Sequence, residues 1–136
     1  MTAYYLDSSV AVRIVLGHSP EAAAWFDATT GSGDDRVLSS RLLRTELTRI
    51  LRREGLPVTD RDRILDYLDT IPLDHAVLQE AEAIVPHIRT LDAVHLGSAL
   101  RSGLDDLTIV THDHAMVAVA TQIGFRVHDP VDSAAP

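Results

Sequence analysis

Short apolar runs alternate with stretches of helical periodicity along the chain, and this alternation constrains the fold more than any other feature. Ala3–Leu6 and Leu107–Val110 have the length of buried strands, and a third run is centred on Val37-Leu38. A segment with apolar residues at helical spacing follows each of them. Strands that are joined through helices pair in parallel. The sequence therefore predicts an α/β fold whose parallel sheet is covered by helices on both faces.

The rest of the chain extends this pattern without an internal repeat. Ser8 or Ser9 can cap the helix after the first strand, and Pro72 would confine a short strand at 71–73 to a sheet edge. We expect one domain over residues 1–131 and a frayed tail at 132–136. The other predicted elements are helices at 21–28, 40–54, 59–67, 75–85, 91–101 and 114–123 and a strand at 125–127.

Missing residue types exclude several chemistries. The chain has no cysteine, which removes disulfides, thiolate zinc sites and a cysteine nucleophile. All 12 basic residues are arginine, so neither a P-loop lysine nor a Schiff-base lysine is available. No apolar run approaches the roughly 20 residues that span a bilayer. The N-terminus also lacks the pattern of a signal peptide. We therefore expect a cytoplasmic protein without a membrane partner.

Two aspartates come after predicted strands. Asp7 directly follows the first strand, and Asp113 follows the strand Leu107–Val110 by a few residues. The carboxyl ends of parallel strands meet at one edge of a sheet, where α/β proteins bind their ligands. Both carboxylates are therefore expected at that edge. Taken alone, Asp7 is explained more simply as the N-cap of the next helix.

Two further acids lie on predicted helices. Glu46 sits at the border of the apolar face of the long helix, and Asp92 opens a later helix, beside His95. Each acid has a plain alternative role. Glu46 could form a surface ion pair with Arg49 or Arg53. Asp92 could interact with the dipole of its helix. His95 is interpreted as a supporting or packing residue rather than as a metal ligand.

The functional hypothesis depends on the joint placement of Asp7, Glu46, Asp92 and Asp113. Unscreened carboxylates about 4 Å apart repel by about 4 kcal/mol at an effective dielectric constant of 20, so a fold that gathers them needs a cation. Oxygen ligands suit Mg²⁺ and Mn²⁺, which activate water and stabilise charge on a phosphodiester. The histidines that flank Asp113 are less favoured as ligands because consecutive side chains point apart. The sequence does not decide whether such a site holds one ion or two.

The charge distribution limits how a nucleic acid could bind. A net charge of −8 opposes phosphate binding. Bound divalent cations would offset part of this charge, and five arginines fall within positions 41–53. Arg49 and Arg53, one and two turns from Glu46, are the predicted contacts to an RNA backbone.

Four motifs occur in order along the chain. They are Leu6-Asp7-Ser8-Ser9-Val10, Arg44-Thr45-Glu46-Leu47, Leu91-Asp92-Ala93-Val94-His95-Leu96 and Val110-Thr111-His112-Asp113. Together they resemble the motifs of PIN domains, in particular the VapC-type toxins of bacterial toxin–antitoxin pairs. The resemblance covers nearly the whole chain, and its third motif is the most specific.

The resemblance implies a three-layer α/β/α fold with a five-stranded parallel sheet in the order 3-2-1-4-5. It also implies cleavage of RNA that depends on Mg²⁺, for which Mn²⁺ can substitute. Asp7 and Asp92 map to the main metal ligands. The rest of the acidic cluster maps to Glu46 and Asp113, and hydroxyls that orient ligands or water map to Ser8 and Thr111.

The resemblance further implies two protein partners. A cognate VapB-type antitoxin would inhibit the toxin by wrapping over its groove, and the toxin would form a homodimer.

Two other functions are alternatives to a ribonuclease. A Mg²⁺-dependent phosphohydrolase acting on small phosphoesters would use Asp7 as nucleophile, but such enzymes carry a second aspartate where this chain has Ser9. A non-catalytic α/β interaction module would use the acids as helix caps and solvated charges.

Overall fold

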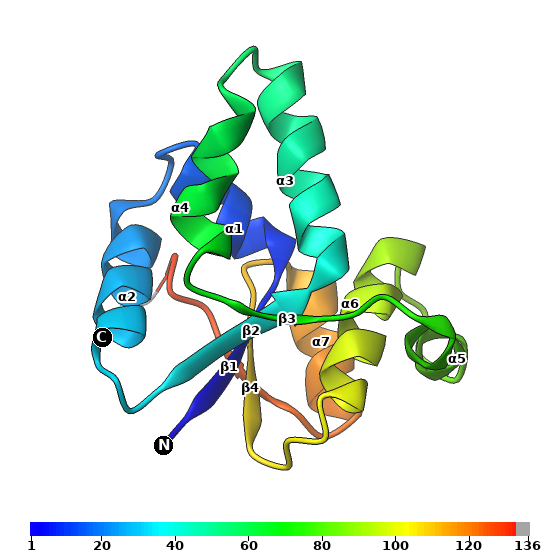
Figure 1. Ribbon diagram of the computed structural model, residues 1–136. Helices are drawn as coiled ribbons and strands as arrows, with labels where there is room; N and C mark the ends of the chain where they lie inside the picture. The colour runs from blue at the N-terminus through cyan, green and yellow to red at the C-terminus, as the bar shows by residue number, and fades with distance from the viewer. Residues whose placement is uncertain (133–136) are drawn as a thin grey trace.

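A parallel sheet with the strand order β3-β2-β1-β4-β5 organises the chain (Figure 1). The computed structural model describes residues 1–132, so the predicted tail, apart from Asp132, lies outside the described residues. The strands are β1 (Ala3–Leu6), β2 (Arg36–Ser40), β3 (Asp69–Ile71), β4 (Leu107–Val110) and β5 (Arg126–His128). The predicted fold class and strand order are confirmed.

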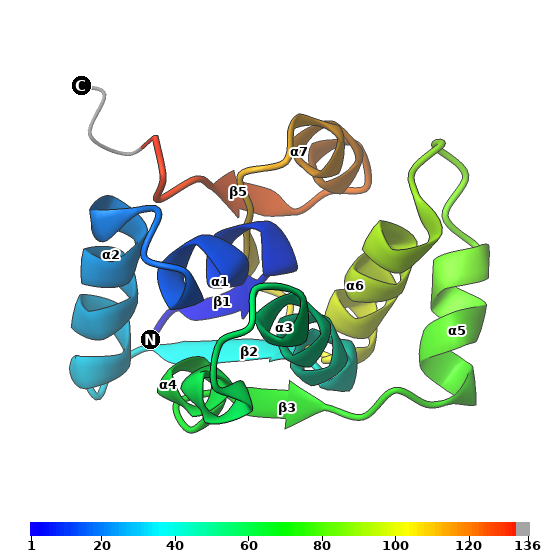
Figure 2. The ribbon, with the colours of Figure 1, turned by 90° about the horizontal axis from the view of Figure 1, so that it is seen from above.

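Helices cover both faces of this sheet because side chains alternate along the strands. In β1, Leu6 packs with the apolar residues of α1, α2 and α3, whereas Tyr5 packs with those of α6 and α7. Figure 2 shows α2 on one side of the strands and α6 on the other. The helices are α1 (Ser8–Val15), α2 (Pro20–Gly31), α3 (Arg41–Arg53), the 3₁₀ helix η1 (Val58–Arg61), α4 (Asp62–Leu65), α5 (His75–Glu82), α6 (Thr90–Arg101) and α7 (His114–Gln122).

Several boundaries differ from the prediction for identifiable reasons. The strand predicted at 71–73 is β3, which ends at Ile71, because Pro72 has no N–H to continue the pairing with β2. β3 does lie at the sheet edge, as expected. The helix predicted at 75–85 ends at Glu82, ahead of Pro86. The helix predicted at 59–67 consists of η1 followed by the short α4.

The close approach of α5 to α6 depends on Gly97. A Cβ atom at this position would lie 2.7 Å from the carbonyl oxygen of Val77 and 2.9 Å from the amide nitrogen of Ala81. Any larger residue would push the two helices apart. This contact fixes α6, the helix that carries Asp92 and His95.

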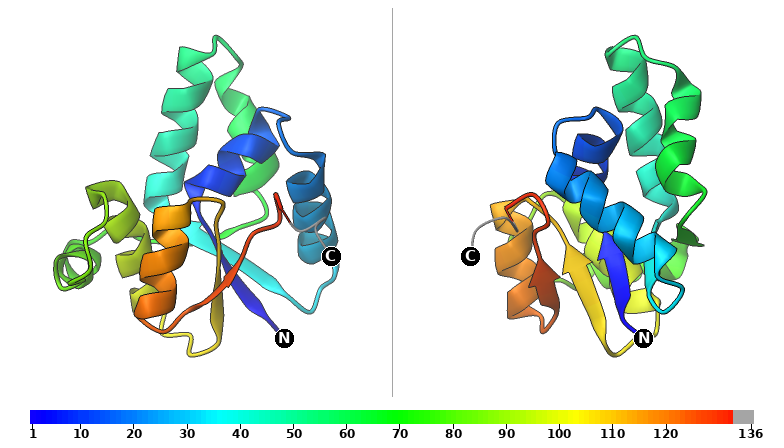
Figure 3. Two further views of the ribbon diagram at one scale, coloured as in Figure 1. Left: turned by 180° about the vertical axis from the view of Figure 1, so that it is seen from behind. Right: turned by 90° about the vertical axis from the view of Figure 1, so that its left-hand side faces the viewer.

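Hydrogen bonds continue past the carboxyl ends of the central strands. The Asp7 amide donates to the Val110 carbonyl (2.9 Å), and the Thr111 amide donates to the His128 carbonyl (3.0 Å). Figure 3 shows β1 running from the N-terminus towards α1, at the edge that these bonds hold together. None of the helices in residues 1–132 has the length and apolar character to cross a membrane.

Candidate active site

Asp7 is buried at the end of β1, with 1% of its surface exposed. It occupies the N-cap position of α1, but its carboxylate makes no capping hydrogen bond. Oδ2 instead accepts hydrogen bonds from Ser9 Oγ (2.7 Å) and Thr111 Oγ1 (2.8 Å). Oδ1 is buried without a hydrogen-bond partner. A buried, unpaired carboxylate oxygen is costly, so helix capping does not explain this residue.

The two hydroxyls on Asp7 belong to a network that joins β1 to the loop after β4. Ser9 Oγ lies 3.2 Å from Thr111 Oγ1 and accepts a hydrogen bond from the His112 amide (3.0 Å). Thr111 Oγ1 accepts one from the Asp113 amide (3.1 Å). Ser9 was not among the predicted site residues, whereas the predicted hydroxyl of Ser8 lines the cavity described below. The sequence offered Ser9 only as a residue of the first motif and as a possible cap of the following helix.

Glu46 reaches the site from α3 and is held by a buried histidine. His95 Nε2 donates to Glu46 Oε1 (2.5 Å), and His95 Nδ1 lies 2.7 Å from the Tyr5 hydroxyl. Burial lowers the pKa of His95, but the hydrogen bond to Glu46 and the charges of Asp7, Glu46 and Asp92 outweigh it and raise this pKa overall. Glu46 is therefore paired with the core of the domain and not with a surface arginine.

Asp92 and Asp113 share one arginine that the sequence interpretation did not include. Arg89 Nε donates to Asp92 Oδ2 (3.1 Å), and Arg89 Nη2 donates to Asp113 Oδ2 (2.5 Å). The other oxygen of Asp113 caps α7, accepting hydrogen bonds from the amides of Ala115 (2.8 Å) and Met116 (3.3 Å). The sequence spacing of Arg89 and Asp92 at the start of one helix was compatible with an ion pair between them. The pairing of Arg89 with Asp113 could not be predicted in this way, because Asp113 lies 24 positions further on.

All four predicted acids line one small cavity of about 220 Å³. Burial, together with the charge of Asp7, raises the pKa of Asp92, and the bond to Arg89 offsets only part of this rise. A second hollow of about 370 Å³ adjoins the first through Ser8, Glu46, Arg89 and Asp92. The remaining residues that line the first cavity are Ser8, Ser9, Val12, Arg13, Ile50 and Arg89.

The residues of this cavity fit a hard divalent cation. Apart from Arg13 and Arg89, its polar side chains offer oxygen atoms, from four carboxylates and the hydroxyls of Ser8 and Ser9. The buried Oδ1 of Asp7 has no hydrogen-bond partner. In residues 1–132, the one group of three histidine or acidic side chains with ligand atoms within 4.8 Å of one another is His112, Asp129 and Asp132. The four acids are thus spaced more widely than that group. Asp7 and Glu46 have separate hydrogen-bond partners, whereas Asp92 and Asp113 share Arg89.

The predicted RNA contacts are not among the residues that line the acidic cavities. Arg49 and Arg53 are exposed on α3, and Arg53 pairs with Glu54 (3.3 Å). Neither residue lines either acidic cavity. The arginines that do line the first cavity are Arg13, which donates to the Ser9 carbonyl (2.7 Å), and Arg89.

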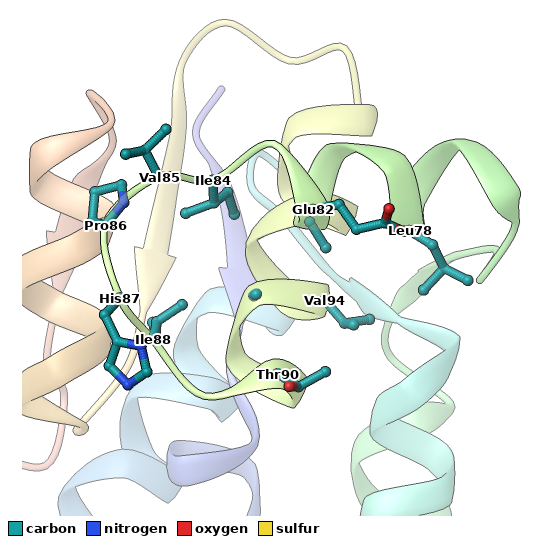
Figure 4. Close-up of a pocket in the computed structure, with 11 residues that line it drawn as sticks. Leu78, Glu82, Ile84, Val85, Pro86, His87, Ile88, Thr90 and Val94 are labelled. Carbon is teal, nitrogen blue, oxygen red and sulfur yellow. The ribbon is translucent and has the colours of Figure 1, made fainter.

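A hollow of different chemistry lies between α5 and α6. It has a volume of about 420 Å³, and Figure 4 shows Leu78, Ile84 and Val85 among the side chains around it. Val85 is 92% exposed. Thr90 borders both this hollow and the second acidic one. Apolar lining suits a protein or lipid-like group better than a phosphate.

Comparisons with known proteins agree on one family. The PIN domain matches residues 4–122. The chain is 35% identical over 131 residues to ribonuclease VapC47 of Mycobacterium tuberculosis, which covers 93% of this chain and 96% of VapC47. It is 36% identical over 132 residues to ribonuclease VapC46 of the same species, covering 96% and 99% of the two chains.

Solved structures show the same fold at lower identity. VapBC2 from Rickettsia felis, bound to a DNA fragment from its promoter, matches with a TM-score of 0.69 at 11% identity, over 94% of this chain and 98% of that one. DNA-bound VapBC from Salmonella typhimurium matches with a TM-score of 0.67 at 17% identity, over 96% and 99%. Sequence, fold and the placement of the acids converge, and this chain belongs to the PIN-domain family, together with the mycobacterial VapC ribonucleases.

Proposed function

We propose that this chain is an endoribonuclease that depends on Mg²⁺, with Mn²⁺ as a substitute, and acts as the toxin of a toxin–antitoxin pair. The observation that carries the proposal is Asp7, whose Oδ1 is buried and unpaired and which lines a cavity together with three further carboxylates. The relatives named as ribonucleases support RNA as the substrate. This chemistry also agrees with the absence of cysteine and lysine from the chain.

Asp7 and Asp92 would be the main ligands of the ion, and Glu46 and Asp113 would complete its surroundings. A bound Mg²⁺ supplies an activated water and stabilises charge on the phosphodiester. Ser9 and Thr111 fix Asp7 by donating to Oδ2, which leaves Oδ1 for the ion. This division of labour between the two oxygens keeps the carboxylate in one orientation.

Glu46 would act from a fixed position, because its partner His95 cannot move away from it. His95 is completely buried, and its second ring nitrogen is held by Tyr5. Burial, with a smaller effect from the charge of Asp7, raises the pKa of Tyr5, which therefore stays a protonated phenol. Glu46 can then orient a water molecule beside the phosphate without turning out of the cavity.

The proposal includes two protein partners. The structural neighbours are VapBC complexes, so we expect a VapB-type antitoxin to bind this chain and inhibit it in the cytoplasm. The exposed apolar side chains of Val85 and Leu78 line the hollow between α5 and α6, and they are suited to contact with a protein. A homodimer is also expected, and light scattering would give twice the chain mass of 14.8 kDa.

The test compares wild type with Asp7→Asn on a labelled single-stranded RNA. Wild type should cut internal bonds with Mg²⁺ or Mn²⁺ and stop when EDTA is added, and Asp7→Asn should lose at least about a hundredfold in rate because it loses a charged ligand. Asp66→Asn, an exposed change at the C-cap of α4, is the control and should cut normally.

Three outcomes would contradict the proposal. Undiminished RNA cleavage in EDTA would remove the metal from the mechanism. Turnover of a small phosphomonoester, with RNA left intact, would favour the phosphohydrolase. If Asp7→Asn changes no activity on either substrate yet the chain still binds a partner, the interaction module would be the better description.

A further inference from the structure

Arg89 combines an exposed side chain with two bonds to half-buried acids. Three-quarters of the Arg89 side chain is exposed (75%), against 13% for Asp92 and 20% for Asp113. Its backbone is anchored, because its carbonyl accepts the Ala93 amide (2.9 Å) at the start of α6. The acids are therefore held by the fold, whereas the guanidinium is a flexible group placed across them from the solvent side.

Arg89 occupies one carboxylate oxygen on each of two acids that line the cavity. Asp113 Oδ1 is committed to capping α7, so Oδ2 is its remaining oxygen, and Arg89 binds it. Arg89 also binds Asp92 Oδ2. A guanidinium and a divalent ion both carry positive charge, so the two cannot occupy the same oxygens without repulsion.

We infer that Arg89 is an internal counter-ion of the acid cavity, which leaves Asp92 and Asp113 when the divalent ion binds and then contacts a phosphate of the RNA. This inference rests on the proposed function. It assigns to one residue two successive anionic partners, first the carboxylates and then the substrate.

The position of Arg89 supports the second half of this exchange. Arg89 lines both acidic hollows, so a guanidinium released from the acids remains at their shared mouth. A planar guanidinium can donate two parallel hydrogen bonds to a phosphate. An exposed ion pair is weak in water, so exchange from carboxylate to phosphate has a low barrier.

The first experiment measures metal binding without RNA. Metal-free wild type, Arg89→Met and Arg101→Met are titrated with MnCl₂ by calorimetry. Removal of the competing cation should lower the Kd of Arg89→Met by about threefold to tenfold. Arg101, exposed at the other end of α6, is the control and its variant should stay within about twofold of wild type.

The second experiment measures cleavage of labelled single-stranded RNA at saturating MnCl₂. Arg89→Met should lose about tenfold or more in kcat/KM in spite of its tighter metal binding, because a charge-assisted bond to the phosphate is gone. Arg89→Lys should recover part of this loss, since it keeps the charge but not the paired donors. Arg101→Met should cleave normally.

The two readouts separate the inference from the proposed function. If wild type binds Mn²⁺ and cleaves RNA but Arg89→Met binds Mn²⁺ no more tightly, the internal counter-ion is refuted while the proposed function stands. If Arg89→Met cleaves at the wild-type rate, the phosphate contact is refuted. If wild type binds no Mn²⁺ at all, both the inference and the metal-dependent function fail.

Discussion

The two sides of the acid cavity hold their carboxylates by different means. On the inner side, Asp7 and Glu46 are bound by groups that are themselves buried, namely the hydroxyl of Thr111 and the ring of His95. On the outer side, Asp92 and Asp113 are bound by the exposed guanidinium of Arg89. One side is built into the core and the other is closed by a side chain from the surface.

The contacts of the inner acids are therefore permanent, whereas those of the outer acids can be exchanged. A buried partner cannot leave without opening the core, so the inner acids keep their positions whether or not a cation is bound. The outer acids can exchange a guanidinium for a metal ion without any change in the backbone. The repulsion among the carboxylates is thus reduced by several different partners. The metal-free state does not depend on a single counter-ion.

The largest expected effect concerns the inner side. His95→Leu removes the partner of the Glu46 carboxylate and one contact of the Tyr5 hydroxyl, so the free energy of unfolding should fall by about 2–4 kcal/mol. Chemical denaturation in EDTA measures it. Arg89→Met on the outer side should leave the unfolding midpoint nearly unchanged. Equal losses from the two variants would remove the distinction between the sides.

A double-mutant cycle sharpens the same comparison. With Glu46→Gln already in place, His95→Leu should cost clearly less than it does alone, because the charged partner has been removed. Additive losses would mean that His95 acts through packing and not through Glu46.

A smaller effect of opposite sign is expected at Asp92. Its pKa is raised in the folded protein, mainly by burial, so its charged form destabilises the fold once the pH exceeds that folded pKa. Asp92→Asn should therefore raise the melting temperature in EDTA at neutral pH by about 2–4 °C. Asp66→Asn is the control. A melting temperature that falls or stays level would show that the bond to Arg89 outweighs burial.

The pH dependence of this effect has a definite direction. Because the folded carboxyl holds its proton to a higher pH than the unfolded chain does, the wild type should lose stability relative to Asp92→Asn as the pH rises from about 4.

The titration of His95 also lowers the stability as the pH rises, but over a different pH range. Its pKa is raised in the fold, so its contribution is complete below about 6.5 and is lost as the pH rises through the folded pKa.

The sequence predicted the parts of the site that local pattern determines. Asp7 and Asp113 follow buried strands, and parallel strands deliver such residues to one edge, so their meeting could be foreseen. The strand order came from the resemblance to PIN domains and not from periodicity. Pro72 correctly marked an edge strand, although β3 ends just before it.

The partners of the acids could not be predicted because they depend on contacts between distant segments. His95 and Glu46 are 49 positions apart, and Arg89 and Asp113 are 24 apart. The helical spacing of Glu46 suggested arginines on its own helix, but the fold turns this acid inward to His95. Tertiary packing decides which of these partners the acid contacts, and a single sequence does not reveal that packing.

Anomalous diffraction from crystals of the full chain grown with MnCl₂ would show whether Asp7, Glu46, Asp92 and Asp113 form one cation site with Arg89 as its exchangeable member. We expect a manganese peak about 2.1 Å from Asp7 Oδ1, with the guanidinium of Arg89 turned away from Asp92. A peak only at His112, Asp129 and Asp132 would contradict this arrangement. So would a peak at Asp7 with Arg89 still bound to both acids.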